Sequence, residues 1–409
     1  MSKIVPSVRF KGFKDDWERL KLGEVVEIKD SARISNTLWV SKGVPYLRSS
    51  DLENCGTLGE LFISDETYQS YKDKTGAPEK DNVLFTSGGK VGVTYHKIDD
   101  DPVYVQGGSI LYAKTSKSNK LNGMYLKAFF GSPAMTKYIE GASTGVTLKH
   151  FTLKPANAAP MILSSLKEQN KIGELFKQLD DIIALHQCML DQKKSFKKTM
   201  LQKMFPQKGE RVPKVRFDGF RGDWEEKFLG NEVEFFSGLT YSPKDIVTKN
   251  GTLVIRSSNV KNGEIVDADN VYVDSSIVNS EKVMIGDIIV VVRNGSRHLI
   301  GKHATVKKNS DNTVIGAFMT GIRSENSNFT NAILDTTQFA IEINKNLGAT
   351  INQITTGNFK KMNFFFPCNK EQQKIGTFFK QLDDKISIHQ KKLENYKQLK
   401  KAFLQRMFV

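Results

Sequence analysis

The chain has 409 residues, of which 39% are hydrophobic and 26% charged, so it is long enough for at least two domains with apolar cores. No segment approaches the unbroken apolar length that a membrane-spanning helix requires, and residues 1–6 lack a secretory signal, so we expect a cytoplasmic protein without a membrane partner. The excess of 60 Lys and Arg over 45 Asp and Glu gives a net charge of +15, which favours a polyanionic partner such as nucleic acid.

Three cysteines are spread along the chain, at Cys55, Cys188 and Cys368. They are odd in number and never form a Cys-x-x-Cys pair, so the sequence predicts neither a disulfide framework nor a zinc site. We expect buried free thiols in a reducing compartment.

An internal repeat begins at the N-terminus. Residues 5–13, VPSVRFKGF, recur at residues 212–220 as VPKVRFDGF. Trp17, which follows the first copy, is matched by Trp224 after the second, 207 positions later. Because a fixed offset marks a duplicated architecture, the chain is expected to contain two related halves.

The repeat continues through predicted strands. Residues 47–50, LRSS, match residues 255–258, IRSS, and each follows an apolar pair that predicts a strand. Residues 81–85, DNVLF, align with residues 287–291, DIIVV. This alignment also pairs the Gly-Gly-Lys turn at 88 to 90 with Asn-Gly-Ser at 294 to 296. We therefore expect buried strands that run into exposed glycine-containing turns.

The clearest repeat opens two predicted long helices, since residues 167–181 recur at residues 370–384. Ser165 with Glu168, and Asn369 with Gln372, predict capping boxes at the helix starts. Apolar residues then follow at alternating three- and four-residue spacing, which predicts a coiled-coil seam. The seam positions are Phe176, Leu179, Ile183, His186, Leu190, Met200 and Met204, and Phe379, Leu382, Ile386, His389, Leu393, Tyr396, Phe403 and Met407.

Helices of about forty residues would be about 60 Å long and could not hide their apolar stripes within one globule. We expect them to pack on each other antiparallel, rather than each on a foreign partner, with the N-terminus near the end of the second helix. The predicted fold is α+β, a pseudo-two-fold tandem duplication with two strand-rich globules separated by the two helices. The predicted segments are 1–164 and 207–368 for the globules, and 165–206 and 369–409 for the helices.

Polar residues interrupt the seam of the predicted coiled coil. His186 and His389 occupy equivalent positions, and a core histidine that shares a hydrogen bond is favoured over a metal ligand, so no metal is predicted. Lys193, Lys197 and Lys400 predict either looser packing toward one end or a surface for another protein.

Motifs for chemistry are missing. Residues 101–104, DPVY, lack the second proline of the Asn/Asp-Pro-Pro-aromatic loop that an adenine methyltransferase needs. The Gly-Lys pairs at Lys90 and Lys302 lack P-loop spacing, and neither an H-E-x-x-H motif nor a nucleophile elbow is present. We predict no catalytic site, although a nuclease built from scattered carboxylates stays open as an alternative.

The duplicated order of these motifs resembles the specificity subunits of type I restriction-modification systems. The resemblance rests on the Arg-Phe-x-x-Phe-x-x-x-Trp segments that end at Trp17 and Trp224, and on the Glu-Gln pairs at Glu168 and Glu371 that follow Pro160 and Pro367. It covers essentially the whole chain. It implies a non-catalytic subunit in which each globule reads one half of a split site on double-stranded DNA.

The resemblance also implies partners and cofactors. Two methyltransferase subunits would dock on this chain and methylate adenine at N6, and two ATP-dependent restriction subunits are a further expectation. The chain itself would hold no cofactor, since S-adenosylmethionine, ATP and Mg belong to the partner subunits. The helices would fix the distance between the two half-sites. A stand-alone two-domain DNA-binding regulator is the alternative, and co-purification with a methyltransferase would separate the two.

Candidate DNA contacts fall in matched places in the two halves. The strand ends at residues 48–50 and 256–258 carry Arg and Ser, which suit phosphates or base edges, but a repeated position is as easily scaffold. The turns at residues 86–90 and 293–298 differ between the halves and are therefore better candidates for specificity.

A third matched pair, at residues 144–150 and 356–361, precedes or borders each long helix and suggests phosphate contacts. An ordinary solvated loop remains the alternative for each group. The candidate DNA-binding residues are Arg48, Ser49, Ser50, Ser87, Gly88, Lys90, Thr144, Lys149, Arg256, Ser257, Ser258, Arg293, Asn294, Ser296, Arg297, His298, Thr356 and Lys360.

Overall fold

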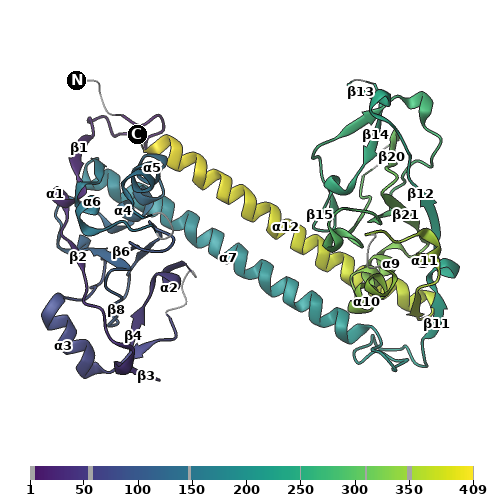
Figure 1. The fold of residues 1–409 in the computed structure, drawn as a ribbon, viewed down its shortest axis with the longest axis horizontal. Coiled ribbons are helices and arrows are strands. Elements are labelled where there is room, and N and C mark those ends of the chain that lie inside the picture. Colours follow the sequence, from purple (N-terminus) through teal and green to yellow (C-terminus); the bar gives the residue numbers. More distant parts are fainter. Residues whose placement is uncertain are drawn as a thin grey trace. The chain divides into compact units, whose positions relative to one another are not determined.

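The structure is a computed structural model that describes residues 5–53, 59–145, 149–248, 250–308, 311–347 and 352–408 (Figure 1). The chain forms two compact units, residues 1–187 with 391–409, and residues 188–390. Each unit holds one globule and the adjoining parts of two long helices, α7 (Leu166–Met204) and α12 (Asn369–Met407). None of the helices described is both long and apolar enough to cross a membrane.

The first globule is built on two small sheets and a strand pair. An antiparallel sheet has the order β2 (Ile28–Asp30), β9 (Ile110–Ala113), β6 (Val83–Thr86), β7 (Thr94–His96). A second has the order β3 (Trp39–Val40), β5 (Phe62–Ile63), β4 (Val44–Leu47), β8 (Tyr104–Val105), with β4 and β8 parallel. β1 (Glu18–Lys21) pairs with β10 (Pro160–Leu163).

Short helices cover the sheets of the first globule. Two of those that pack into its main core are capped by side chains, because Asn122 accepts from the backbone N–H of Tyr125 and Ser132 from that of Met135. The helices are α1 (Leu22–Val25), α2 (Ser49–Glu53), α3 (Asp65–Thr75), α4 (Gly123–Phe130), α5 (Pro133–Ala142) and α6 (Leu153–Ala158), with 3-10 turns at Asn36–Leu38 and Thr115–Lys117.

The second globule repeats this topology. Its sheets have the orders β12 (Glu234–Ser237), β21 (Met319–Arg323), β18 (Ile288–Val291), β19 (His303–Thr305), and β13 (Ile246–Val247), β17 (Val271–Val273), β14 (Thr252–Ile255), β20 (Thr313–Ile315). β11 (Glu225–Phe228) pairs with β22 (Asn363–Phe366), and a further hairpin joins β15 (Val260–Lys261) to β16 (Glu264–Ile265). The duplication predicted from the sequence is confirmed.

The second globule also repeats four of the six short helices, while the places of α2 and α3 are taken by 3-10 turns. Its α11 contacts α8, as α6 contacts α1 in the first globule. The helices are α8 (Leu229–Glu232), α9 (Ser327–Leu334), α10 (Thr337–Asn346) and α11 (Thr356–Lys360), with 3-10 turns at Pro243–Asp245, Ser257–Asn259, Ser275–Ile277 and Arg297–Leu299.

The predicted alignment of the central strands is wrong by one residue. Val83 pairs with His96 in β7 and Ile288 pairs with Thr305 in β19, so Val83 corresponds to Ile288 rather than to Ile289. The side chain of Asn82 accepts from the backbone of Glu79 as that of Asp287 accepts from Met284, which gives the same register. Because β6 and β18 are buried on both faces, they lack the alternation that would reveal a slip in the sequence.

Within each unit the two long helices run antiparallel. In the first unit Lys400 binds Asp180, and the rings of His186 and Tyr396 lie parallel with centroids 5.7 Å apart. In the second unit Lys197 binds Asp383. The predicted antiparallel packing is confirmed.

Lys197 and Lys400 do not loosen the seam, contrary to one of the two expectations from the sequence. Each binds an aspartate of the other helix, and both the lysines and the aspartates, Asp383 and Asp180, are 203 positions apart. The repeat therefore places a matched ion pair between the helices in each unit.

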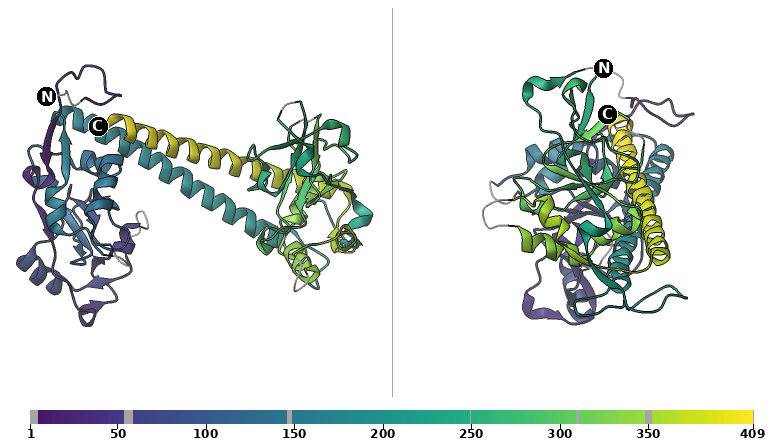
Figure 2. Two further views of the ribbon diagram at one scale, coloured as in Figure 1. Left: turned by 45° about the horizontal axis from the view of Figure 1, so that its top comes forward. Right: turned by 90° about the vertical axis from the view of Figure 1, so that its right-hand side faces the viewer.

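The end of each long helix is buried in a globule. The C-terminal end of α12 lies against the first globule (Figure 2). Phe408, after α12, contacts the rings of Tyr125, Phe129 and Phe176 in the first unit. Phe205, after α7, contacts Trp224, Phe329 and Phe379 in the second unit in the same way. The sequence predicted the helices but not these buried ends.

The opening segment of each half lies against the end of a long helix. The backbone N–H of Val8 donates to the carbonyl of Arg406 over 2.9 Å, and that of Val215 donates to the carbonyl of Lys203 over 2.9 Å. The expected proximity of the N-terminal segment to the end of the second helix is confirmed.

The glutamate of the Glu-Gln pair at each helix start anchors the opening segment instead of closing a capping box. Glu168 accepts from Arg9 at 2.7 and 2.8 Å and from the indole of Trp17 at 3.1 Å, and its hydrogen bond raises the pKa of Arg9. Glu371 accepts from Arg216 at 2.7 and 2.8 Å. The backbone N–H of Glu168 still donates to the side-chain oxygen of Ser165 at 3.4 Å. Of the two hydrogen bonds of the predicted capping box, this is the one that forms.

The second helix start departs from the predicted capping box too. The side chain of Gln372 donates to the carbonyl of Pro367 at 3.0 Å, and that of Gln169 donates to the carbonyl of Ser164 at 2.8 Å. A glutamine in this place therefore satisfies a carbonyl just before its own helix. Capping residues and anchoring residues are the same types, which is why the sequence alone suggested a box.

The prediction of buried cysteines is wrong for two of the three. Cys188 and Cys368 are free thiols, as expected, but both are exposed. Cys188 lies on α7 between two seam positions, and Cys368 immediately precedes α12, so neither faces a core. Cys55 lies outside the described residues.

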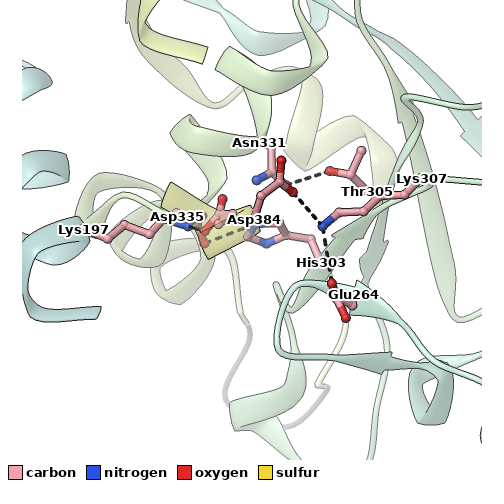
Figure 3. A network of polar contacts seen from close by, with 9 residues as sticks. Lys197, Glu264, His303, Thr305, Lys307, Asn331, Asp335 and Asp384 are labelled. Carbon is pink, nitrogen blue, oxygen red and sulfur yellow. Dashed lines mark hydrogen bonds and ion pairs between the residues drawn. The ribbon is translucent and has the colours of Figure 1, made fainter. Parts of the chain in front are cut away.

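A polar network ties the second globule to both long helices within the second unit (Figure 3). Lys197 of α7 binds Asp335 at 2.6 Å and also Asp383 of α12. His303 Nε2 lies 3.4 Å from Asp335, and Lys307 lies 3.4 Å from both Glu264 and Asp384. The pairs of Lys197 are partly buried, so removing one partner would leave a charge without full compensation by water.

The network makes the stability of the second unit depend on pH. Burial opposes protonation of His303, but the hydrogen bond and charge of Asp335 outweigh it and raise the pKa of His303 above 6.5. When the pKa of a histidine is higher in the folded than in the unfolded state, its protonation stabilises the fold fully at a pH below the unfolded-state pKa. This contribution is lost as the pH rises through the folded-state pKa. We expect wild type to exceed His303→Gln in unfolding free energy most near pH 6, with a smaller difference near pH 8.5, in urea titrations. A difference that grows with pH would contradict this assignment.

Candidate nucleic-acid interface

The strand-end arginines occupy the same structural position in both globules. The backbone N–H of Arg48 donates to Asp51 at 2.7 Å, and that of Arg256 donates to Asn259 at 2.9 Å. The guanidinium of Arg48 lies 3.4 Å from Asp51, and that of Arg256 lies 2.6 Å from Asp269. Both arginines are thus paired with acids, so contact with DNA would require exchange of a carboxylate for a phosphate.

The serines beside these arginines differ in exposure. Ser49, Ser257 and Ser258 are half-buried and Ser50 is exposed. The hydroxyl of Ser258 is buried and has no hydrogen-bond partner among the described residues. Of these serines, Ser50 is the one best placed to meet a ligand without rearrangement.

The turn after β6 is less exposed than the sequence suggested. Ser87 and Gly88 are buried, because the backbone of Ser87 donates to Ser109 and accepts from Phe151 at 2.8 and 2.7 Å. Lys90 is exposed. The expectation of an exposed turn is therefore wrong for Ser87 and Gly88 and correct for Lys90.

The turn after β18 does present polar side chains. Asn294 is half-buried and caps a local turn by accepting from the backbone of Ser296 at 2.9 Å. Its amide also donates to Ser257 at 3.1 Å, which joins the turn to the strand end of β14. The exposed residues of this turn are Arg293, Ser296, Arg297 and His298.

In the first globule, the strand-end residues after β4 also lie close to the turn after β6. A Cβ atom added to Gly89 would lie 3.7 Å from the hydroxyl oxygen of Ser49. The strand-end group and the turn group are therefore neighbours in both globules, as matched sites require.

The third predicted pair is wrongly matched. Thr152 precedes α6 and Thr355 precedes α11 at equivalent places 203 positions apart, so Thr356 corresponds to Leu153 and not to Thr144. Thr144 and Lys149 are exposed, whereas Thr356 is half-buried. The sequence match failed because similar Thr-Gly and Lys residues occur in both segments at different places.

Lys360, at the end of α11, packs against α8 in the second globule. It is exposed, but its stem packs against α8, since a Cβ atom added to Gly230 would lie 2.8 Å from Lys360 Cβ. It is thus placed by the contact between α11 and α8 rather than by the turn after β18.

The residue that the sequence missed beside the second turn is Gln353. Arg293 and Gln353 form an isolated antiparallel bridge, as Gly88 and His150 do in the first globule. Thr144 and His150 form a further bridge. The offset of 203 between His150 and Gln353, which is the offset of the long helices, is the signal that could have revealed this match.

The fold defines a tandemly duplicated two-domain chain, with matched strand ends and turns that carry different side chains. A family model described as the type I restriction modification DNA specificity domain matches residues 14–193 and residues 221–398. The chain therefore belongs to this family, which confirms the resemblance inferred from the sequence.

Individual relatives agree with the family match. The StySPI specificity subunit of Salmonella potsdam is 29% identical over 190 residues, 44% of this chain and 41% of the relative. The EcoKI specificity subunit of Escherichia coli K12 is 28% identical over 176 residues, 41% of this chain and 38% of the relative. The matches thus span about two-fifths of the length of these two relatives.

A solved structure shares the fold over its full length. The S subunit of a type I restriction-modification system from M. genitalium superposes with a TM-score of 0.73 over 99% of both chains, at 14% identity. The fold is therefore common to two sequences of low identity.

Proposed function

We propose that this chain is the non-catalytic DNA specificity subunit of a type I restriction-modification complex, and that each globule reads one half of a bipartite site. The observation that carries the proposal is the match of the specificity-domain family to both halves of the chain. Two globules of one topology with different exposed side chains suit two different half-sites. The net charge of +15 supports binding to the phosphate backbone.

We propose as partners double-stranded DNA and two methyltransferase subunits that methylate adenine at N6 with S-adenosylmethionine. ATP-dependent restriction subunits that use Mg complete the proposed complex in the cytoplasm. The two long helices are proposed to set the spacing between the half-sites and to dock the methyltransferase subunits. The family match favours this assembly over a stand-alone regulator.

Direct reading of bases is proposed for the exposed turn side chains of the second globule, and backbone contacts for the lysines and strand-end residues. Arg293, Ser296, Arg297 and His298 are exposed and can reach a groove. Lys90, Thr144 and Lys149 are exposed in the first globule and suit phosphates. Arg48 and Arg256 are held by acids and suit a positioning role.

Exchange of one recognition region tests the proposed function. Cells that express this chain with its methyltransferase should show adenine methylation at a bipartite motif by methylome sequencing. Replacing residues 207–368 with the region of another family member should change one half of that motif and leave the other half and the gap unchanged. The reciprocal exchange of residues 1–164 is the matched control and should change the other half. Simultaneous change of both halves, or methylation without this chain, would contradict the proposal.

A further inference from the structure

In both globules, two adjacent residues at the end of a central strand are held by the same backbone hydrogen bonds, which we call the hydrogen-bonded frame. In the first, the backbone N–H groups of Ser87 and Gly88 both donate to the carbonyl of Ser109, at 2.8 and 3.3 Å. In the second, those of Val292 and Arg293 both donate to the carbonyl of Phe318, at 3.0 and 3.2 Å. Gly88 therefore corresponds to Arg293, and Ser109 corresponds to Phe318.

The other edge of the frame matches as well. The N–H of Phe151 donates to the carbonyl of Ser87 at 2.7 Å, as the N–H of Ile354 donates to the carbonyl of Val292 at 2.9 Å. The bridge of Gly88 with His150 then matches the bridge of Arg293 with Gln353.

Three positions thus share their backbone contacts and differ in their side chains. The first globule carries Gly88, Ser109 and His150, and the second carries Arg293, Phe318 and Gln353 at the same places. Two domains that read different sequences should keep the backbone scaffold and vary the side chains that specify bases.

Arg293 is set up to meet a ligand. Its guanidinium carbon lies 5.0 Å from the centroid of the Phe318 ring, and Phe318 is 53% exposed. In the part of the chain that the structure describes, Arg293 has no carboxylate at ion-pair distance, whereas the strand-end Arg256 is paired with Asp269. The Phe318 ring lies under the guanidinium and supports it, and it leaves the N–H groups available.

On the basis of the function proposed above, we propose that Arg293 is a specificity-determining residue that reads a guanine in the half-site of the second globule, with Phe318 as its stacking support. A guanidinium offers two parallel donors, which match the O6 and N7 acceptors of guanine in the major groove. A support that restricts the side chain before binding lowers the entropy lost on contact. Gly88 offers no side chain, so the first globule does not read the matched position in this way.

The test measures binding of the full chain, with its methyltransferase subunits, to duplexes in which each base pair of the second half-site is changed in turn. Wild type should lose roughly tenfold to a hundredfold in affinity when one particular G·C pair is replaced. Arg293→Gln should bind the original duplex more weakly and tolerate any base at that pair, with every other requirement intact. Phe318→Leu should weaken discrimination at the same pair.

Control variants separate base reading from loss of charge. Arg293→Lys keeps the charge without the fork, so it should lose discrimination at the G·C pair while it retains most non-specific binding. Arg221→Gln removes an exposed arginine of the opening segment and should leave the base profile unchanged. Thermal unfolding of each variant should match wild type, since Arg293 is exposed.

Two results would overturn the assignment. If Arg293→Gln weakens binding equally on all duplexes and lowers its salt dependence, Arg293 contacts a phosphate. If every base requirement persists, Arg293 is not a reader. In both cases wild type still shows a bipartite motif, whereas failure of the proposed function would show as no motif in wild type.

Discussion

Replacing Glu168 with alanine is expected to destabilise the first unit by about 3–5 kcal/mol. The carboxylate is fully buried and accepts from both Arg9 and the indole of Trp17. Its removal would leave a nearly buried guanidinium and a buried indole N–H without their acceptor. Urea-induced unfolding followed by tryptophan fluorescence measures the loss.

Glu371→Ala is the matched control in the second unit. Glu371 binds Arg216 with the same geometry, but the buried indole of Trp224 has no hydrogen-bond partner in the described part of the chain. The loss for Glu371→Ala should therefore be smaller by about 1 kcal/mol, the value of one hydrogen bond. Equal losses would show that the indole of Trp17 contributes nothing, and a loss below about 1 kcal/mol at Glu168 would refute the anchoring role.

Replacing Phe408 with alanine is expected to cost the first unit about 3–5 kcal/mol. Phe408 is 5% exposed. The centroid of its ring lies 5.4 Å from that of Tyr125, 5.5 Å from that of Phe129 and 5.7 Å from that of Phe176. The substitution would leave a cavity lined by aromatic rings and free the end of α12. Limited proteolysis should then cleave the first unit sooner, and its unfolding midpoint in urea should fall.

Phe205→Ala is the matched variant in the second unit, and Phe196→Ala is the exposed control. Phe205 occupies the matched place in the second unit and is 7% exposed, so its loss should be similar but should affect the second unit. Phe196 on α7 is 46% exposed, and its replacement should cost much less. A similar loss at Phe196 and Phe408 would mean that the helix end is not part of the core.

The register of the central strands could not be predicted, because β6 and β18 are apolar on both faces. A one-residue slip changes neither hydrophobicity nor length, so only backbone pairing distinguishes Ile288 from Ile289 as the counterpart of Val83. The mistaken match of Thr144 with Thr356 has the same origin. Short polar segments repeat by composition, and only the hydrogen bonds that hold them show which residues correspond.

Side-chain partners were equally beyond the sequence. Glu168 has the spacing of a capping residue, yet its carboxylate accepts a hydrogen bond from Arg9, 159 positions away. Cys188 and Cys368 belong to a residue type that is usually buried, yet both are exposed because their positions on and before the long helices face away from the cores. Contacts between residues far apart in the chain decide these outcomes.

The sequence by itself determined the duplication, the two long helices, their antiparallel packing and the family, since these follow from offsets, periodicity and motif order. The sequence also predicted DNA contacts at strand ends and turns, and these stay predictions. Only the tertiary structure decided that Gly88 and Arg293 share one backbone frame, and that the ends of the long helices are buried in the cores. Repeats and hydrophobic periodicity can be recognised in the sequence alone. Which residues of the two halves correspond, and which are buried, depends on contacts between segments that are far apart in the chain.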